Sequence, residues 1–175
     1  MARLSFENSV ERLRAAGLVA RDDTPQIPSR MPRADDEDLV GVRVFRMVVE
    51  RGDCSGLVMP RSFFGRSEVN AVSFADSDLS ESNLCWNDFI DVSFEGADLS
   101  RSDMRASLWT RVSFKGADLS GADLRRSFFE ACDFSGARMQ GVVLTDILEI
   151  TSALSAAQIA AIAWADEEGP EPDGG

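Results

Sequence analysis

The chain has 175 residues, a length that suits one domain with a hydrophobic core of its own. It contains no histidine, which excludes Ser-His-Asp and Cys-His nucleophile systems, HExxH metal sites and every imidazole ligand. The formal net charge is -12, but residues 51–145 contribute only -4, from 14 acidic and 10 basic side chains. Residues 146–175 carry 7 acidic side chains and no Lys or Arg, so much of the acidity lies at the C-terminus.

The start of the chain predicts a soluble, cytoplasmic protein. Its first residues are polar or charged, as at Arg3, Glu7 and Glu11, and no small-residue cleavage site follows an apolar stretch. No run approaches the ~20 apolar residues that a membrane span needs, so no membrane association is expected. The three cysteines lack CxxC spacing and are an odd number, which favours reduced thiols over disulfides or a zinc site.

A short helix and a linker are expected before the main domain. Phe6, Val10 and Leu13 have helical spacing, and Gly17 is a plausible stop. Residues 21–38 contain three prolines and the acidic run DDED, a composition typical of a loop or linker.

From Met59 to Leu144 an apolar residue recurs every five positions without a break. The residue two positions before each is never larger than Val or Asn between Ser62 and Val142. A period of five fits neither a strand, whose faces alternate every residue, nor an α-helix, in which five steps rotate by roughly 140°. The chain must therefore turn every five residues, with both recurring positions facing a core. Residues 39–49 look like strand in the same register, so an irregular first coil is also expected.

A longer period of twenty residues shows how the coils stack. VSFEGADLS at residues 92–100 returns as VSFKGADLS at residues 112–120. Four pentapeptides therefore make one coil, and residues twenty apart lie above one another on one side of a four-sided tower. The predicted fold class is an all-β solenoid.

These repeats resemble the pentapeptide repeat family, whose motif reads approximately A(D/N)LXX. The motif stands as ADLSG at residues 117–121 and ADLRR at 122–126, with looser copies SNLCW at 82–86 and SDMRA at 102–106. The resemblance covers about residues 57–146 and implies a right-handed quadrilateral parallel β-helix, a handedness that agrees with the usual crossover rule. It also implies a role in protein binding. Members that protect DNA gyrase from quinolones are thought to imitate DNA, and the unbroken register here resembles members without projecting loops.

A second helix is expected after the tower. Residues 155–158 match the S-x-x-Q capping box, and Leu154 and Ile159 sit where a hydrophobic staple belongs. A helix over about residues 156–165 follows, with Ile159 and Ile162 on the face that either covers the last coil or joins a second copy. The expected organisation is a helix and linker at 1–38, the β-helix at 39–150, the C-terminal capping helix at 151–166 and a disordered acidic tail at 167–175.

Four outward apolar residues form one candidate site. Leu108 and Phe128 each precede a core position and lie twenty apart, Ile90 belongs to the same side, and Trp86 lies near its corner. Exposed apolar residues are often merely tolerated. Because these four cluster in the predicted geometry, a partner-binding or dimer surface is the competing interpretation.

A second candidate site is an acidic wall that contains Asp98 and Asp118. Such aspartates are ordinary chemistry of the repeat, and the alternative is that they imitate DNA. Duplex DNA as tall as a ~24 Å tower carries about 14 charges, far more than the net -4 of the repeat segment. Cys85 is expected to point outward as an unreactive exposed thiol.

No residue pattern indicates a catalytic, cofactor or metal site. The favoured function is a non-catalytic protein-interaction module, with a type II topoisomerase, DNA gyrase, as the best specific partner by analogy with the family, and no direct contact with nucleic acid. The alternative is a structural or assembly protein that forms a homodimer through its C-terminal helix. An enzyme is disfavoured because no polar cluster converges on a pocket.

Overall fold

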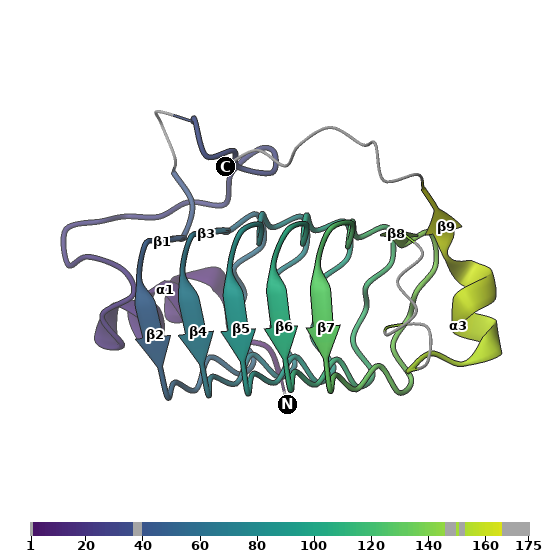
Figure 1. Cartoon of the computed structure of the whole chain (residues 1–175). Coiled ribbons are helices and arrows are strands. Elements are labelled where there is room, and N and C mark those ends of the chain that lie inside the picture. The colour runs from purple at the N-terminus through teal and green to yellow at the C-terminus, as the bar shows by residue number, and fades with distance from the viewer. Residues whose placement is uncertain (1, 37–39, 146–149, 151–152, 166–175) are drawn as a thin grey trace.

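The computed structural model describes residues 2–36, 40–145, 150 and 153–165. The expected parallel β-solenoid is confirmed. Figure 1 shows the strands standing in a row along the tower, with α1 (Phe6–Ala15) beside the first strands and α3 (Ala156–Ala161) beyond the last. No helix within the described ranges is long and apolar enough to cross a membrane.

One side of the tower, here called the strand side, is a five-stranded parallel sheet. Each strand after the first pairs with the one twenty residues earlier, as Trp109 does with Phe89. On the adjoining side β1 (Arg43–Phe45) pairs with β3 (Phe63–Gly65) in the same register, so the tower begins before the first regular repeat. The strands of the strand side are β2 (Val48–Glu50), β4 (Glu68–Asn70), β5 (Asp88–Ile90), β6 (Leu108–Thr110) and β7 (Phe128–Glu130).

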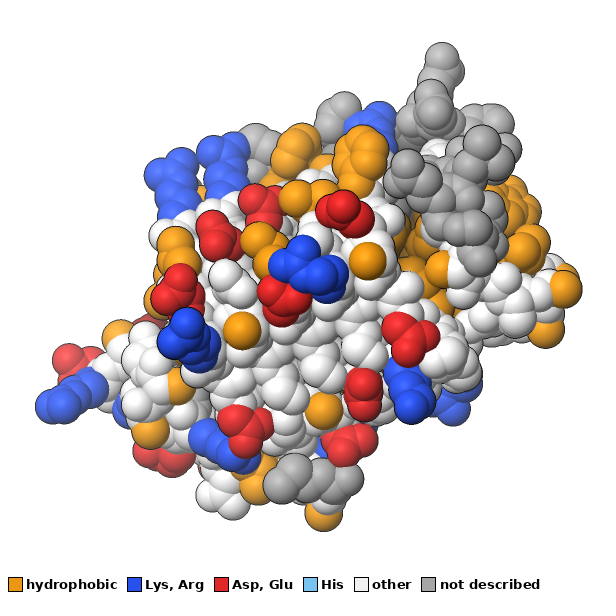
Figure 2. Space-filling model, turned by 60° about the horizontal axis from the view of Figure 1, so that its bottom comes forward, with side chains coloured by type: hydrophobic (Ala, Val, Ile, Leu, Met, Phe, Trp, Pro, Cys, Tyr) orange, Lys and Arg blue, Asp and Glu red, His pale blue; other side chains and the backbone are white. Residues whose placement is uncertain are grey.

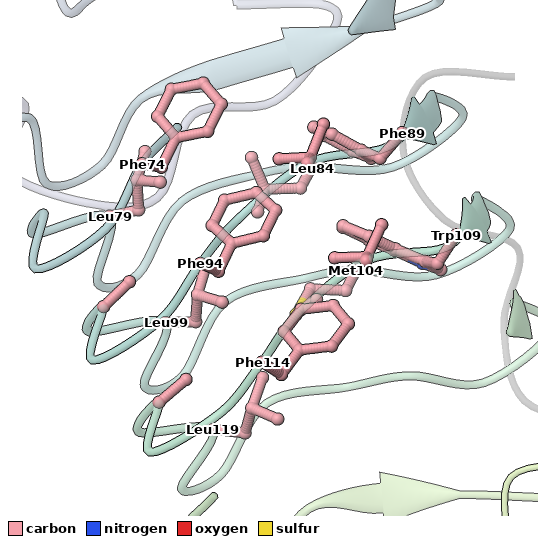
Figure 3. Packing of buried hydrophobic residues seen from close by; sticks show 14 of the residues in the cluster. Phe74, Leu79, Leu84, Phe89, Phe94, Leu99, Met104, Trp109, Phe114 and Leu119 are labelled. Atoms are coloured by element: carbon pink, nitrogen blue, oxygen red, sulfur yellow. The ribbon is translucent and has the colours of Figure 1, made fainter. Parts of the chain in front are cut away.

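The core consists of columns of side chains twenty residues apart. Phe94 stacks between Phe74 and Phe114, with ring centroids 5.2 and 5.6 Å away, and Trp109 stacks on Phe89 at 4.3 Å. Figure 3 shows these rings pointing into the tower above one another. The small residues two positions earlier are small because the stacked rings leave no room for larger ones.

The N-terminal helix covers the first coil. Ser5 caps α1, and Val10 and Leu13 are buried in the common core. The hydroxyl of Ser9 accepts a hydrogen bond from the backbone N–H of Val58 at 2.8 Å. One coil later the equivalent N–H donates to a backbone carbonyl of the preceding coil, so Ser9 replaces a carbonyl that the first coil lacks.

The linker crosses the side that carries β1 and β3. The Arg61 guanidinium donates to the carbonyl of Pro28 at 2.8 Å, and the Asn83 amide donates to the carbonyl of Pro32 at 3.1 Å. Cys85 is only 2 % exposed there, so the prediction of an exposed thiol was wrong. The repeat register predicts an outward side chain, but the Cys85 thiol donates to the carbonyl of Asp103 in the next coil at 3.6 Å. Burial raises the pKa of its thiol and keeps it protonated.

The C-terminal helix closes the other end and is shorter than expected. Ser155 and Gln158 form the predicted capping box, but α3 ends at Ala161. The chain then forms β9 (Ala163–Trp164), which pairs with β8 (Val143–Leu144) in the twenty-residue register. The strand pairing of β9 with β8 therefore replaces about one further turn of helix.

A side chain of α3 completes the hydrogen bonding of the last coil. Gln158 Nε2 donates to the carbonyls of Phe134 and Ala137 at 2.8 and 3.0 Å. In the preceding coil the backbone N–H of Arg138 donates to the carbonyl of Ala117, the position equivalent to Ala137. Gln158 stands 21 residues after Ala137, the same separation as between Arg138 and Ala117. Its side-chain amide therefore donates the hydrogen bond that a backbone N–H would donate in a further regular coil. The predicted tail at 167–175 lies outside the described residues.

Candidate protein-binding groove

A groove runs along the tower where the side of β1 and β3 turns into the strand side. It consists of two adjoining depressions of about 670 and 440 Å³ that share Trp86, Asp88 and Ala106. We call it the corner groove. Its corner wall consists of Arg46, Arg66, Trp86, Ala106 and Arg126, and its strand wall of Val48, Glu68, Asp88, Leu108 and Phe128, the first residues of the five strands.

Hydrophobic side chains of the groove are strongly exposed. Phe128 is 66 % and Val48 65 % exposed, at opposite ends of the groove, while Leu108 is 38 % and Trp86 36 % exposed. Figure 2 shows hydrophobic side chains gathered in the upper part of the view, with Lys and Arg side chains projecting beside them. The structure thus brings three of the four residues singled out in the sequence into one groove. Ile90 lies on the same side but is half-buried and does not line it.

Sequence reasoning missed Val48 and the arginines of the corner wall. The signal was present, because Arg46 and Arg66 precede Trp86 at intervals of twenty. It concerns outward positions, which the five-residue period of the core does not single out.

The corner wall holds non-glycine residues in a strained backbone conformation. Arg46, Arg66, Trp86, Ala106 and Arg126 all have positive φ, between 51 and 60°. An L-residue in this region costs roughly 1–2 kcal/mol relative to the right-handed conformation, a cost that glycine avoids. Two pentapeptides further along the coil, glycine occupies the equivalent corner at Gly96, Gly116 and Gly136. Arg51, Arg61, Arg101 and Arg111 at other corners have the same conformation, so it belongs to the coil in general and not to the groove alone.

The outward aspartates of the opposite side, here called the aspartate side, are used by the fold. Asp78, Asp98 and Asp118 each accept the backbone N–H two residues on, at Ser80, Ser100 and Ser120, with all three distances 3.0 Å. In each pentapeptide the N–H of the core residue donates to the next coil and that of the aspartate to the preceding coil. The serine N–H faces neither coil, and the aspartate side chain satisfies it.

The two aspartates proposed for an acidic wall also have basic neighbours. The guanidinium of Arg138 lies 2.7 Å from Asp118, and that of Arg3 lies 4.0 Å from Asp98. Burial acts to raise the pKa of Asp118, but hydrogen bonds from Ser120 and Arg138 outweigh it and hold that pKa below its ordinary value. Both carboxylates are half-buried and already bonded, which leaves little of their charge to display to a partner.

The three predicted residues of the C-terminal segment lie over the last coil. Leu154 and Ile162 are buried in the common core, and Ile159 packs against it partly buried. Within the described ranges, no group of three His, Cys, Asp or Glu side chains could hold a metal ion.

The stacked coils and their filled core define the class of protein, a parallel β-solenoid with an exposed groove. Residues 70–105 and 110–147 match the family model of pentapeptide repeats in 8 copies. These two segments of the chain are therefore pentapeptide repeats.

Solved structures similar to this chain include pentapeptide repeat proteins. One, from the thylakoid lumen of Arabidopsis thaliana, is 23% identical over 61% of this chain and 67% of that chain, with a TM-score of 0.30. Another, Rfr23 from the cyanobacterium Cyanothece 51142, is 12% identical over 55% of this chain and 86% of that chain, with a TM-score of 0.27. QnrB1, a plasmid-mediated fluoroquinolone resistance protein, is 11% identical over 71% of this chain and 90% of that chain, with a TM-score of 0.27. A comparison with curated proteins found no match.

Proposed function

We propose that this protein is a non-catalytic binding module that captures another protein on its corner groove. One observation carries the proposal. Of the seven large hydrophobic side chains that are exposed in the described part of the chain, four line this groove: Val48, Trp86, Leu108 and Phe128. Clustered exposed apolar side chains are typical of protein-binding surfaces, and aromatic residues contribute most to their affinity.

The construction of the tower supports this role. The groove side chains project from strands and corners whose backbone is paired with the coils above and below, so binding requires little ordering of the tower. A preorganised surface loses less entropy on association than a flexible one.

DNA gyrase is the specific partner that we propose to test. The family resemblance supports this choice, as does the acidic net charge of -12, which favours encounter with a basic surface. We assign the contact to the corner groove. The Asp98 and Asp118 carboxylates are already bonded within the fold, so they are the weaker candidate surface.

A gyrase supercoiling assay, with and without a quinolone, tests the partner and the surface together. The wild-type chain is expected to change supercoiling or its inhibition by the drug. The double variant Leu108→Ser with Phe128→Ser should lose this effect, while Asp98→Asn with Asp118→Asn should retain most of it. The matched control is Ile27→Ser with Val40→Ser, which removes two exposed apolar side chains outside the groove.

The results test the choice of partner and the choice of binding surface separately. No effect of the wild-type chain in either condition would reject gyrase as the partner. An effect that the groove variant retains and the aspartate variant loses would reject the groove as the binding surface.

A homodimer through the C-terminal helix is the less favoured alternative. Leu154 and Ile162 are buried within a single chain, so they already serve to cover the last coil. Sedimentation equilibrium that reports a stable dimer would restore this alternative.

A further inference from the structure

The corner wall of the groove is basic in a chain that is strongly acidic. It carries Arg46, Arg66 and Arg126, one above another at intervals of twenty or sixty residues. Arg46 lies over the Phe45 ring, 5.1 Å from its centroid, and forms no ion pair within the described part of the chain. Glu68 and Asp88 stand on the strand wall, across the groove. An acidic occupant is therefore favoured along the corner wall and disfavoured on the strand wall.

The described chain ends in line with this wall. β9 repeats the register of β8, and the backbone N–H of Ala165 donates to the carbonyl of Leu144 at 3.0 Å. In the twenty-residue register Ala165 stands forty residues after Arg125, so the described chain ends one register position before the corner on which Arg126 stands. A segment that leaves Ala165 begins two coils beyond the Arg126 end of the groove.

The segment that follows has a composition that complements the corner wall. Residues 166–175 read DEEGPEPDGG, with five acidic side chains, no basic one and two prolines. Proline-containing segments favour the extended polyproline II conformation and dock in aromatic-lined grooves at low entropic cost. Residues 166–175 lie outside the described residues, so the argument for where they bind rests on their sequence, on the geometry of the groove and on charge.

We propose that residues 166–175 occupy the corner groove of their own chain, with their acidic side chains along the arginine wall. The spacings agree. In polyproline II geometry Pro172 lies about 19 Å beyond residue 166, at ~3.1 Å per residue. Trp86 stands four coils below the register position that follows Ala165, also about 19 Å at ~4.8 Å per coil.

The acidic side chains of the segment also lie at distances that match those of the arginines on the corner wall. Asp173 lies about 22 Å along the segment, and Arg66 about 24 Å along the groove. Glu168 lies about 6 Å along the segment, and Arg126 about 10 Å along the groove, within reach of a long guanidinium side chain. A proline thus meets the exposed tryptophan while acids meet arginines on either side of it.

The tail would then compete with any partner that needs the groove, a consequence that rests on the proposed function. Tethered segments have effective concentrations of about 1 mM, so even weak docking covers a groove most of the time. If the free tail binds with a dissociation constant near 0.1 mM, a partner would bind the full chain about tenfold more weakly than a chain that ends at Ala165.

A peptide-binding experiment tests the docking without any partner. A fluorescent peptide of residues 165–175 is titrated with the chain truncated after Ala165 and, separately, with the full chain, and its anisotropy is measured at low salt. We expect saturable binding to the truncated chain, at least tenfold weaker binding to the full chain, and loss of binding as salt screens the charges. A peptide with Asn and Gln in place of Asp and Glu should not bind.

Matched variants of the truncated chain locate the contact. Arg46→Glu with Arg66→Glu should abolish peptide binding. Arg51→Glu with Lys115→Glu makes the same charge change outside the groove and should leave binding within about twofold; Arg51 shares the strained corner conformation, with φ 52° against 53° for Arg46. Circular dichroism confirms that each variant folds.

The experiment can reject docking of the tail without rejecting the proposed function, and the reverse. Equal binding to full and truncated chains, equal loss in both charge variants, or no saturable binding would each overturn the docking. If docking holds and gyrase binds neither chain, gyrase is rejected as the partner and the tail assignment stands. If gyrase binds the full and truncated chains equally, competition by the tail is rejected while the proposed function stands.

Discussion

The aspartate side and the strand side are built from the same pentapeptide but use its outward position differently. On the aspartate side Asp78, Asp98 and Asp118 satisfy a backbone N–H that no neighbouring coil reaches. On the strand side the equivalent position holds Val48, Glu68, Asp88, Leu108 and Phe128, and none of these side chains accepts such a bond within the described part of the chain.

The difference indicates where the chain is free to specialise. Where an aspartate is needed to accept a backbone N–H at a turn, aspartate recurs at intervals of twenty residues. Its carboxylate is then hydrogen-bonded within the fold. Where continuous strands pair over three residues, the ladder supplies the pairing and the outward residue can change. An exposed groove with varied side chains therefore arises on the strand side, while a solvated structural wall forms opposite.

The largest expected effect is the unfolding of the whole tower, which would remove the aspartate side and the strand side together. Phe94→Asp places a carboxylate between the stacked rings of Phe74 and Phe114, in a core without partners for it. An unpaired buried charge costs several kcal/mol, comparable with the total stability of a domain of about 5–15 kcal/mol. Circular dichroism should show no cooperative thermal transition. A variant that melts cooperatively near the wild-type temperature would contradict the inward orientation of this column.

A smaller effect tests the two roles of aspartate directly. Asp98→Ala leaves the Ser100 N–H without its acceptor and should cost about 1–2 kcal/mol. Asp88→Ala removes the same group on the strand side and should change stability by less than about 0.5 kcal/mol. Urea unfolding of both variants measures the difference. Equal losses would remove the proposed distinction between the sides.

The pH dependence of stability should follow the aspartate side. Because the pKa of Asp118 is lowered in the folded state, the unfolded chain binds more protons in acid. The contribution of Asp118 is therefore fully present above its ordinary pKa of 3.8 and is lost as pH falls through the lower, folded value. Urea midpoints of Asp118→Asn should fall less steeply in acid than those of the wild type. Equally steep midpoints in both would contradict this role of Asp118.

The smallest expected effect on stability concerns the groove. Leu108→Ser and Phe128→Ser remove exposed side chains and should each change the free energy of unfolding by no more than about 0.5 kcal/mol. A thermal melt of the double variant checks this and serves as the folding control for the binding assay. A loss of several kcal/mol would mean that both residues belong to the core of the tower rather than to a binding surface.

The sequence alone determined the tower. The five-residue period placed the inward column residues from Met59 to Leu144, and the twenty-residue period placed Leu108 beside Phe128 and Phe94 beside Phe114 on neighbouring coils. This was possible because a solenoid is built from contacts between neighbouring coils, so local spacing translates directly into position. The capping box of Ser155 and Gln158 was equally local and equally visible.

Only the tertiary structure decided what happens where segments distant in sequence meet the tower. The linker accepts a hydrogen bond from Asn83, two residues before the buried Cys85, and Ser9 completes the hydrogen bonding of the first coil. After α3 ends, β9 continues the register of β8. The corner groove likewise needed the structure, because it arises between two sides of a coil and not within either repeat. Repeat spacing assigns each side chain to a column, but the depth between columns and the cover from other segments depend on packing in three dimensions.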